Sequence, residues 1–138
     1  MTALPRISFT VAGTPLPWAR ARRRGSRYFT APEQAAYRER IAWAFQAAIT
    51  QVPETWSLCA RYAVRLVAEF PDHKRHDADN VAKGCLDALI NVAYIDDSQV
   101  DDLRIVKRVG DDPRLDVEIA VIALAPAVTP KRARRRVA

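Results

Sequence analysis

Cysteine and glycine are scarce in this chain of 138 residues, which contains 2 Cys and 4 Gly. Cys59 and Cys85 lie far apart without a C-x-x-C pair, which argues against both a disulfide framework and a cysteine zinc site. We expect both to be buried, reduced thiols. The glycines form no phosphate-binding loop, and no nucleophile-elbow motif surrounds a serine. These absences leave the charged residues as the main candidates for catalytic or binding residues.

Long apolar runs are also missing, since none approaches the ~18 residues of a membrane span. The N-terminus MTALPRISFT lacks the charged-then-apolar layout of a signal peptide, so we expect a cytoplasmic protein. A length below ~150 residues suits one domain. With 49% hydrophobic and 28% charged residues, the composition is that of a globular chain.

The net charge of +6 is unevenly distributed. Ten basic residues form two runs, namely Arg20, Arg22, Arg23, Arg24 and Arg27 near the start and Lys131, Arg132, Arg134, Arg135 and Arg136 near the end. Removing these ten from the 22 Lys and Arg leaves 12 against 16 acidic residues, so the remainder is mildly acidic. Two basic segments on such a body favour a polyanionic partner, above all nucleic acid. The alternative is that both runs are solvated tails.

Hydrophobic periodicity predicts the first half of the fold. Residues 7–12 have strand composition, and residues 18–28, rich in arginine and without an apolar period, are expected to form a mobile basic loop. A helix is predicted from about residue 30 until Pro53 ends it. Residues 58–70 alternate between apolar and polar side chains and predict a strand with one core face.

The second half begins with a polar turn and a helix whose apolar side contains Ala82 and Leu89. Residues 103–109 and 115–124 are expected to be strands joined as a hairpin through the turn at 110–113. Together these elements predict an α+β fold in which two main helices cover one face of a mixed sheet. We assign residues 1–124 to this domain and residues 125–138 to a basic, disordered tail.

Acidic residues gather between Lys74 and Asp102 despite the basic total. Asp79, Lys83 and Asp87 recur every four residues and therefore share one face of the predicted helix. Asp96 and Asp97 follow the helix, where a return of the chain would bring them near Asp79. Carboxylates that converge raise one another's pKa, and a divalent cation resolves this conflict. His73 and His76 are only a weak candidate pair for zinc. The carboxylates are hard oxygen donors, which favour Mg²⁺ or Mn²⁺.

A structural interpretation of the same residues stays open, because an Asp at a helix start can be an N-cap and carboxylates spaced four residues from a lysine form ordinary ion pairs. The metal interpretation joins a carboxylate-bound magnesium ion to basic arms, which is the combination that a nucleic-acid phosphodiesterase needs.

Four stretches carry a resemblance to a known family. They are VAGTPLPWARARRRGSRY, TAPEQAAYRERI, the motif D-x-D-N-x-x-K-x-x-x-D-A-L that begins at Asp77, and D-D-x-Q-V that begins at Asp96. On these residues the sequence resembles the RusA-like Holliday junction resolvases, over residues 7–124. The spaced set is far more specific than a lone pair of acids; it comprises Asp77, Asp79, Asn80, Lys83, Asp87, Asp97 and Gln99.

The resemblance implies an endodeoxyribonuclease of bacterial or phage origin that uses Mg²⁺ and acts as a homodimer. Such an enzyme resolves four-way DNA junctions by paired symmetric nicks in homologous recombination and DNA repair. The implied metal ligands and catalytic carboxylates are Asp77, Asp79 and Asp97, and Lys83 is the implied catalytic lysine. Asn80, Asp87 and Asp96 are expected to support them. The first arginine run, Arg20, Arg22, Arg23, Arg24 and Arg27, is expected to bind DNA.

Two other functions remain as alternatives at this point. One is a less selective nuclease that cuts flaps and other branched DNA, because nothing in the sequence encodes four-way geometry. The other is a non-catalytic DNA-binding module whose acids serve only as caps and ion pairs. Substrate preference separates the first from a resolvase, and turnover separates the second.

Overall fold

The computed structural model describes residues 4–52 and 55–124. In chain order the elements are β1 (Arg6–Ala12), β2 (Arg22–Arg24), β3 (Arg27–Phe29), α1 (Pro32–Ile49), β4 (Arg61–Phe70), α2 (Ala78–Ala88), the 3-10 turn η1 (Asp97–Gln99), β5 (Val100–Val109) and β6 (Arg114–Ala123). This confirms the predicted α+β class, with two main helices and a mixed sheet. The predicted tail at residues 125–138 lies outside the described residues.

The main sheet has the strand order β1-β6-β4-β5. β4 pairs in parallel with β5 and antiparallel with β6, which in turn pairs antiparallel with β1. The hairpin predicted between the last two strands is therefore wrong, because β4 lies between β5 and β6. The segment that joins them passes the end of β4, where the Gly110 amide donates to the Phe70 carbonyl at 3.0 Å.

Glu69 explains why this connection is not a hairpin turn. Its side chain is only 9% exposed, accepts from Arg108 Nε at 2.9 Å and accepts from the Asp112 amide at 2.8 Å. A Cβ at Gly110 would stand 2.6 Å from the Glu69 carboxyl group, so a larger residue there would displace this side chain. The carboxylate thus holds the chain across the end of β4, an interaction that no local turn pattern encodes.

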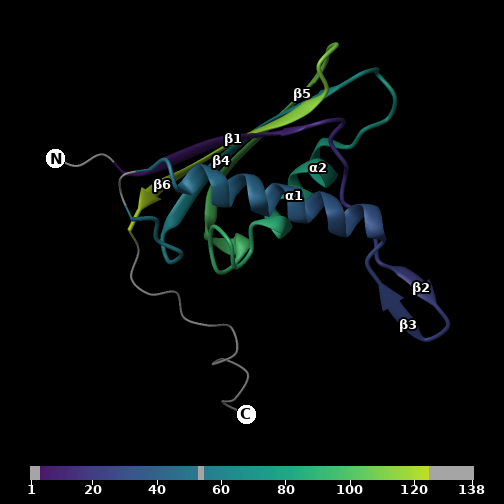
Figure 1. Ribbon diagram of the computed structural model, residues 1–138, viewed down its shortest axis with the longest axis horizontal. Coiled ribbons are helices and arrows are strands. Elements are labelled where there is room, and N and C mark those ends of the chain that lie inside the picture. The colour runs from purple at the N-terminus through teal and green to yellow at the C-terminus, as the bar shows by residue number, and fades with distance from the viewer. Residues whose placement is uncertain (1–3, 53–54, 125–138) are drawn as a thin grey trace.

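One face of the sheet is covered by helices, as predicted. Figure 1 shows α1 lying across the sheet with α2 beside it, and α1 contacts β1 and α2 while α2 also contacts β5. The core side chains of β4 are Tyr62, Val64, Leu66, Ala68 and Phe70, all at most 2% exposed. The alternation read from residues 58–70 is therefore correct for the strand itself, although β4 begins only at Arg61.

The predicted mobile loop at residues 18–28 is also wrong in part. β2 and β3 pair antiparallel as a short hairpin, with Gly25 in the turn at φ 62°. That angle lies in the left-handed region, which glycine adopts at little cost. In Figure 1 the hairpin projects past the N-terminal end of α1, away from the main sheet.

Both cysteines are free, but only one is buried as expected. Cys85 lies in the core on α2, whereas Cys59 is exposed just before β4. Burial raises the pKa of the Cys85 thiol to about 12, so this thiol stays protonated near neutral pH. Across residues 4–52 and 55–124, no helix is both long enough and apolar enough to span a membrane.

Candidate active site

α2, the turn before β5 and β5 itself form the walls of one open groove of about 530 Å³. Three of the predicted catalytic residues line it, namely Asp79, Lys83 and Asp97. Its apolar wall consists of Ala82, Leu86, Leu103 and Ile105, with Ala78 at the start of the helix. The fold therefore brings Asp97 to the helix face that carries Asp79 and Lys83, as the sequence predicted from a return of the chain.

Asp77 lies just outside this groove, at the N-cap position of α2. Its side chain makes no capping hydrogen bond, although Asp is a favoured N-cap residue. Instead its Oδ2 atom accepts from Asn80 Nδ2 at 3.4 Å, and its Oδ1 atom lies 4.0 Å from Arg75 Nε. Asn80 thus contacts one of the predicted ligands.

Lys83 is held between an acid and an aromatic ring. Its Nζ atom lies 3.3 Å from Asp87 Oδ2 and 5.0 Å from the centre of the Trp18 ring. The ion pair has the spacing expected of helix neighbours, and an ammonium over an indole face is attracted by the ring quadrupole. Asp87 therefore forms an ion pair with Lys83 across one turn of α2.

The segment that carries Trp18 packs directly on α2. The Trp18 amide donates to the Asn80 carbonyl at 2.9 Å, and a Cβ at Gly84 would stand 3.4 Å from the Trp18 nitrogen. Gly84 therefore permits the close approach of this backbone to the helix. Trp18 is half-buried there, and it directly precedes the arginine-rich hairpin.

Asp97 is positioned by a buried glutamine. Gln99 is fully buried, and its Oε1 atom accepts from the amides of Ile95 at 3.0 Å and Asp96 at 2.9 Å. Its Nε2 atom donates to the carbonyls of Leu58 at 2.8 Å and Ala60 at 3.0 Å. These four bonds fasten the turn that contains Asp97 to the segment entering β4.

Asp96 completes this turn as an N-cap. Its Oδ2 atom accepts from the Ser98 amide at 3.1 Å, and together with Gln99 it forms a capping box. Arg61 adds a second anchor, because its Nη2 atom donates to the Ser98 carbonyl at 3.0 Å while Nε donates to Asp101 at 2.9 Å. The hydrogen bond from Arg61 holds the pKa of the Asp101 carboxyl below its usual value.

The oxygen donors of the groove fit a hard divalent cation. Asp79 and Asp97 present carboxylates without a neighbouring His or Cys among the groove-lining residues. Mg²⁺ is typically bound through one or two carboxylates plus waters and substrate phosphates, so two carboxylates in one open groove suit it. Within the described part of the chain, no group of three or more His, Cys, Asp or Glu side chains is gathered tightly enough to hold a metal ion by itself. Asp77 is thus not brought together with the other two.

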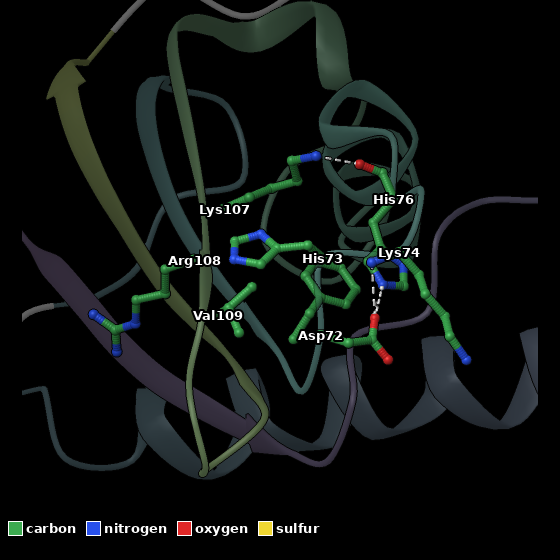
Figure 2. A pocket seen from close by; sticks show the side chains of 8 residues that line it. Asp72, His73, Lys74, His76, Lys107, Arg108 and Val109 are labelled. Atoms are coloured by element: carbon green, nitrogen blue, oxygen red, sulfur yellow. Dashed lines mark hydrogen bonds and ion pairs between the residues drawn. The ribbon is translucent and has the colours of Figure 1, made fainter.

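A separate, narrower recess of about 160 Å³ lies at the carboxyl ends of β4 and β5. Figure 2 shows His73 and Lys107 in this recess, with the Lys107 ammonium donating to the His76 carbonyl. The His76 ring stacks on Phe70 with their centroids 3.8 Å apart, and its Nε2 atom lies 3.3 Å from Asp72 Oδ1. These contacts fix the residue before Asp77 and leave the two histidines without a zinc-like arrangement.

The arginines predicted to bind DNA are all exposed, with Arg22, Arg23 and Arg24 on β2, Arg27 on β3 and Arg20 in the preceding segment. Arg22 pairs with Glu33 at 2.8 Å, which ties the hairpin to the first turn of α1. Arg23 and Arg24 lie over the rings of Tyr28 and Phe29, at 5.9 and 5.8 Å from their centres. The hairpin therefore presents positive charge and aromatic surface together.

Sequence reasoning missed three supporting contacts of the groove. It included Trp18 only as the start of the basic loop, whereas the ring lies beside Lys83. Gln99 was recognised only within the motif, and its buried bonds had no signal in the pattern. Arg61 lies at the start of β4, and no spacing rule links it to a turn 37 residues later.

The fold and site define a small α+β domain with an open carboxylate and lysine groove and a separate arginine-rich hairpin. A profile of the family described as Endodeoxyribonuclease RusA matches residues 12–120. That span includes the groove, its supporting contacts and the hairpin, and the chain belongs to this family.

Named relatives agree with this assignment. The chain is 36% identical over 89 residues to the crossover junction endodeoxyribonuclease rusA of Enterobacteria phage HK97, a match that covers 64% of this chain and 71% of the relative. It is 32% identical over 98 residues to the crossover junction endodeoxyribonuclease RusA of Escherichia coli strain K12, covering 67% and 78%. The corresponding protein of Enterobacteria phage 82 is 31% identical with the same coverage.

Proposed function

We propose that this protein is a Mg²⁺-dependent endodeoxyribonuclease that resolves four-way DNA junctions by paired symmetric nicks. Its place would be homologous recombination and DNA repair in the bacterial cytoplasm. The observation that carries the proposal is the convergence of Asp79, Asp97 and Lys83 on one groove in a member of the RusA family. The relatives whose names specify crossover junctions support the choice of substrate.

Asp79 and Asp97 would hold the Mg²⁺ ion, for which Mn²⁺ is the alternative. Asp77 would add a third carboxylate if its side chain turned toward them from the adjoining helix start. The ion, when bound, supplies an activated water and positive charge at the scissile phosphate. Asn80 and the capped turn at Asp96 would keep these carboxylates in place.

Lys83 would stabilise the negative charge that grows on the phosphate in the transition state. A fixed cation at that point costs no reorganisation when the charge develops, which is why such groups accelerate reactions. Asp87 and Trp18 restrain the ammonium from two sides, and Asp87 is itself half-buried. The lysine therefore enters the reaction already oriented toward the groove.

Two symmetric nicks require two sites related by a two-fold axis, which a homodimer supplies. The outer edge of β5 supports such pairing, because β5 is the last strand of the sheet and its backbone edge has no partner among the described strands. Val106 and Val109 are 38% and 41% exposed on this strand. Exposed apolar side chains on an open strand edge favour docking by a second chain.

The hairpin arginines would bind DNA phosphates around the groove. They are exposed, and among them only Arg22 forms an ion pair with an acid in the described part of the chain. Phosphate contacts from arginine release condensed counterions and give salt-dependent affinity.

The test is cleavage of an end-labelled synthetic four-way junction with Mg²⁺, beside a flap and a linear duplex. We expect paired symmetric nicks on the junction that disappear in EDTA. Asp79→Asn should lower cleavage by more than about 100-fold, since even residues that only support a metal ligand contribute 10- to 100-fold. Junction binding by this variant should be retained.

Lys83→Gln should lower cleavage about 100- to 1,000-fold, as loss of a charge-stabilising donor does elsewhere. Arg6→Gln is the control, because it removes one positive charge from an exposed position on β1 that does not line the groove. Equal cutting of flap and junction would make the protein a less selective nuclease. Binding without cutting of any substrate would leave a DNA-binding module.

A further inference from the structure

We infer that the β2–β3 hairpin contains a binding site for an unpaired nucleobase, formed by Tyr28 and Phe29 and flanked by Arg24 and Arg27. These four residues line one recess of about 510 Å³ on the hairpin. The inference deepens the proposed function and rests on it, because it names the part of a branched DNA that this hairpin recognises. Neighbouring base pairs open most readily at a branch point.

The two rings are presented to solvent without a role in the core. Tyr28 is 69% exposed and Phe29 is 38% exposed, although each ring could bury a large apolar area. Among the described residues, neither ring contacts another aromatic ring, and their cation contacts are with Arg23 and Arg24. Aromatic rings left open in this way are platforms on which bases stack.

The arginines give the site its preference for nucleic acid. Arg24 lies directly opposite Arg27 in the hairpin register, beside the turn at Gly25. Like charges placed across a strand pair destabilise it, and a phosphate between the two guanidinium groups would relieve this repulsion. An apolar protein partner would leave the repulsion in place, so the charges favour a polyanion such as DNA.

The contrast with Trp18 assigns the stacking role to the hairpin. Trp18 is half-buried on α2, where its ring lies beside Lys83, so less of this ring is open to a base than at Tyr28, which is 69% exposed. Tyr28 and Phe29 lie on a strand of three residues that projects from the domain, where a base can approach (Figure 1). Stacking depends on the π face that every base has, so the site would recognise an unpaired base without reading its identity.

The first experiment compares binding to a four-way junction and to a linear duplex, in the Asp79→Asn background so that no DNA is cut. Replacing Tyr28→Ala and Phe29→Ala together should weaken junction binding by about 5- to 100-fold, the range expected from lost base stacking. Duplex binding should change by less than about twofold, because phosphate contacts dominate it.

Two controls accompany this double variant. Tyr28→Phe with Phe29→Tyr keeps both rings and should bind the junction like the parent. Trp43→Ala removes an aromatic ring that is 67% exposed on α1, away from the hairpin, and should leave both affinities unchanged. Thermal unfolding of each variant confirms that the domain remains folded.

A second experiment places abasic nucleotides at the branch point of the junction. The parent should bind this junction more weakly than the intact junction. The double alanine variant has no rings to stack, so it should bind the two junctions with nearly the same affinity. Equal losses of junction and duplex affinity in the double variant, or undiminished sensitivity to abasic nucleotides, would overturn the base-binding site. A parent protein that neither prefers nor cuts the junction would instead overturn the proposed function.

Discussion

The groove and the hairpin are built in opposite ways. In the groove, the turn that carries Asp97 is held by the buried Gln99, which makes four hydrogen bonds, and the half-buried Trp18 ring lies beside Lys83. The hairpin consists of exposed residues only, and an exposed ion pair between Arg22 and Glu33 ties it to α1. Chemistry requires atoms held at fixed positions, whereas a polyanion can be bound by side chains that adapt to it.

Gln99→Leu should show the largest effect, because it removes the groove's buried support without altering a groove side chain. The substitution leaves two amides and two carbonyls without their partner, so we expect a loss of about 3 kcal/mol in the free energy of unfolding. Cleavage should fall as well, since the turn that carries Asp97 loses its anchor. Urea unfolding and junction cleavage measure the two effects.

The matched control is Gln46→Leu, the same chemical change at an exposed position on α1. It should alter the free energy of unfolding by less than about 0.5 kcal/mol. If Gln99→Leu were equally mild, buried support would not distinguish the groove from the hairpin.

Trp18→Leu should reduce the cleavage rate at saturating DNA by about tenfold, with little change in junction affinity. The reason is loss of the cation–π contact that restrains Lys83, an interaction of about 0.5–2 kcal/mol. Trp18→Phe retains a ring and should recover most of the rate, whereas a purely structural defect would not be rescued in this way. Single-turnover kinetics separate rate from binding.

Trp43→Leu is the control for Trp18, because its ring is exposed and its indole nitrogen contacts only Glu39, at 3.3 Å, among the described residues. A similar loss of rate in both variants would show that Trp18 acts through general stability. A fall in affinity rather than rate would place Trp18 with the hairpin instead of the groove.

Arg24→Gln together with Arg27→Gln tests the hairpin, where we expect DNA binding to change while stability does not. Stability should stay within about 0.5 kcal/mol of the parent, because both side chains are exposed. DNA binding should lose about 2 from the slope of log affinity against log salt, or about one for each phosphate contact. Arg6→Gln, an exposed arginine at the start of β1, is the control, and its slope should match that of the parent.

The smallest expected effect concerns pH and the Arg61 anchor. Because its hydrogen bond to Arg61 lowers the pKa of Asp101 in the folded protein, ionised Asp101 stabilises the fold. This contribution is present above the unfolded pKa of about 4 and is lost as pH falls through the lower folded value. Asp101→Asn should therefore be less stable than the parent at pH 7 and differ less at pH 3, as measured by urea unfolding. A difference independent of pH would contradict this origin.

Local patterns predicted much of the fold. The alternation in residues 58–70 identified the core face of β4, and the spacing of Asp79, Lys83 and Asp87 placed them on one face of α2. Asn91 takes the left-handed conformation at φ 64°, as expected of the residue standing where glycine often ends a helix. Such features depend on side chains a few residues apart, which a sequence displays directly.

Pairings between distant segments were not predictable in the same way. The sequence suggested a hairpin for the last two strands, but β4 separates them because Glu69 and the parallel β4–β5 pairing hold β5 on the other side. The basic segment at residues 18–28 was predicted to be a loop, because the alternation of side chains in a strand of three residues is too short to detect. Burial of Cys85 and exposure of Cys59 likewise depend on neighbours that the local pattern does not reveal.

The sequence by itself determined the chemical groups of this protein, namely the carboxylates, the lysine and the arginine run, together with its family resemblance. Only the tertiary structure decided that Asp97 meets Asp79 and Lys83 in one groove, that the Trp18 ring lies beside Lys83 and that Tyr28 and Phe29 remain open. The physical reason is that residue type and short-range spacing are properties of the chain. Contact between residues far apart follows from the packing of the whole core.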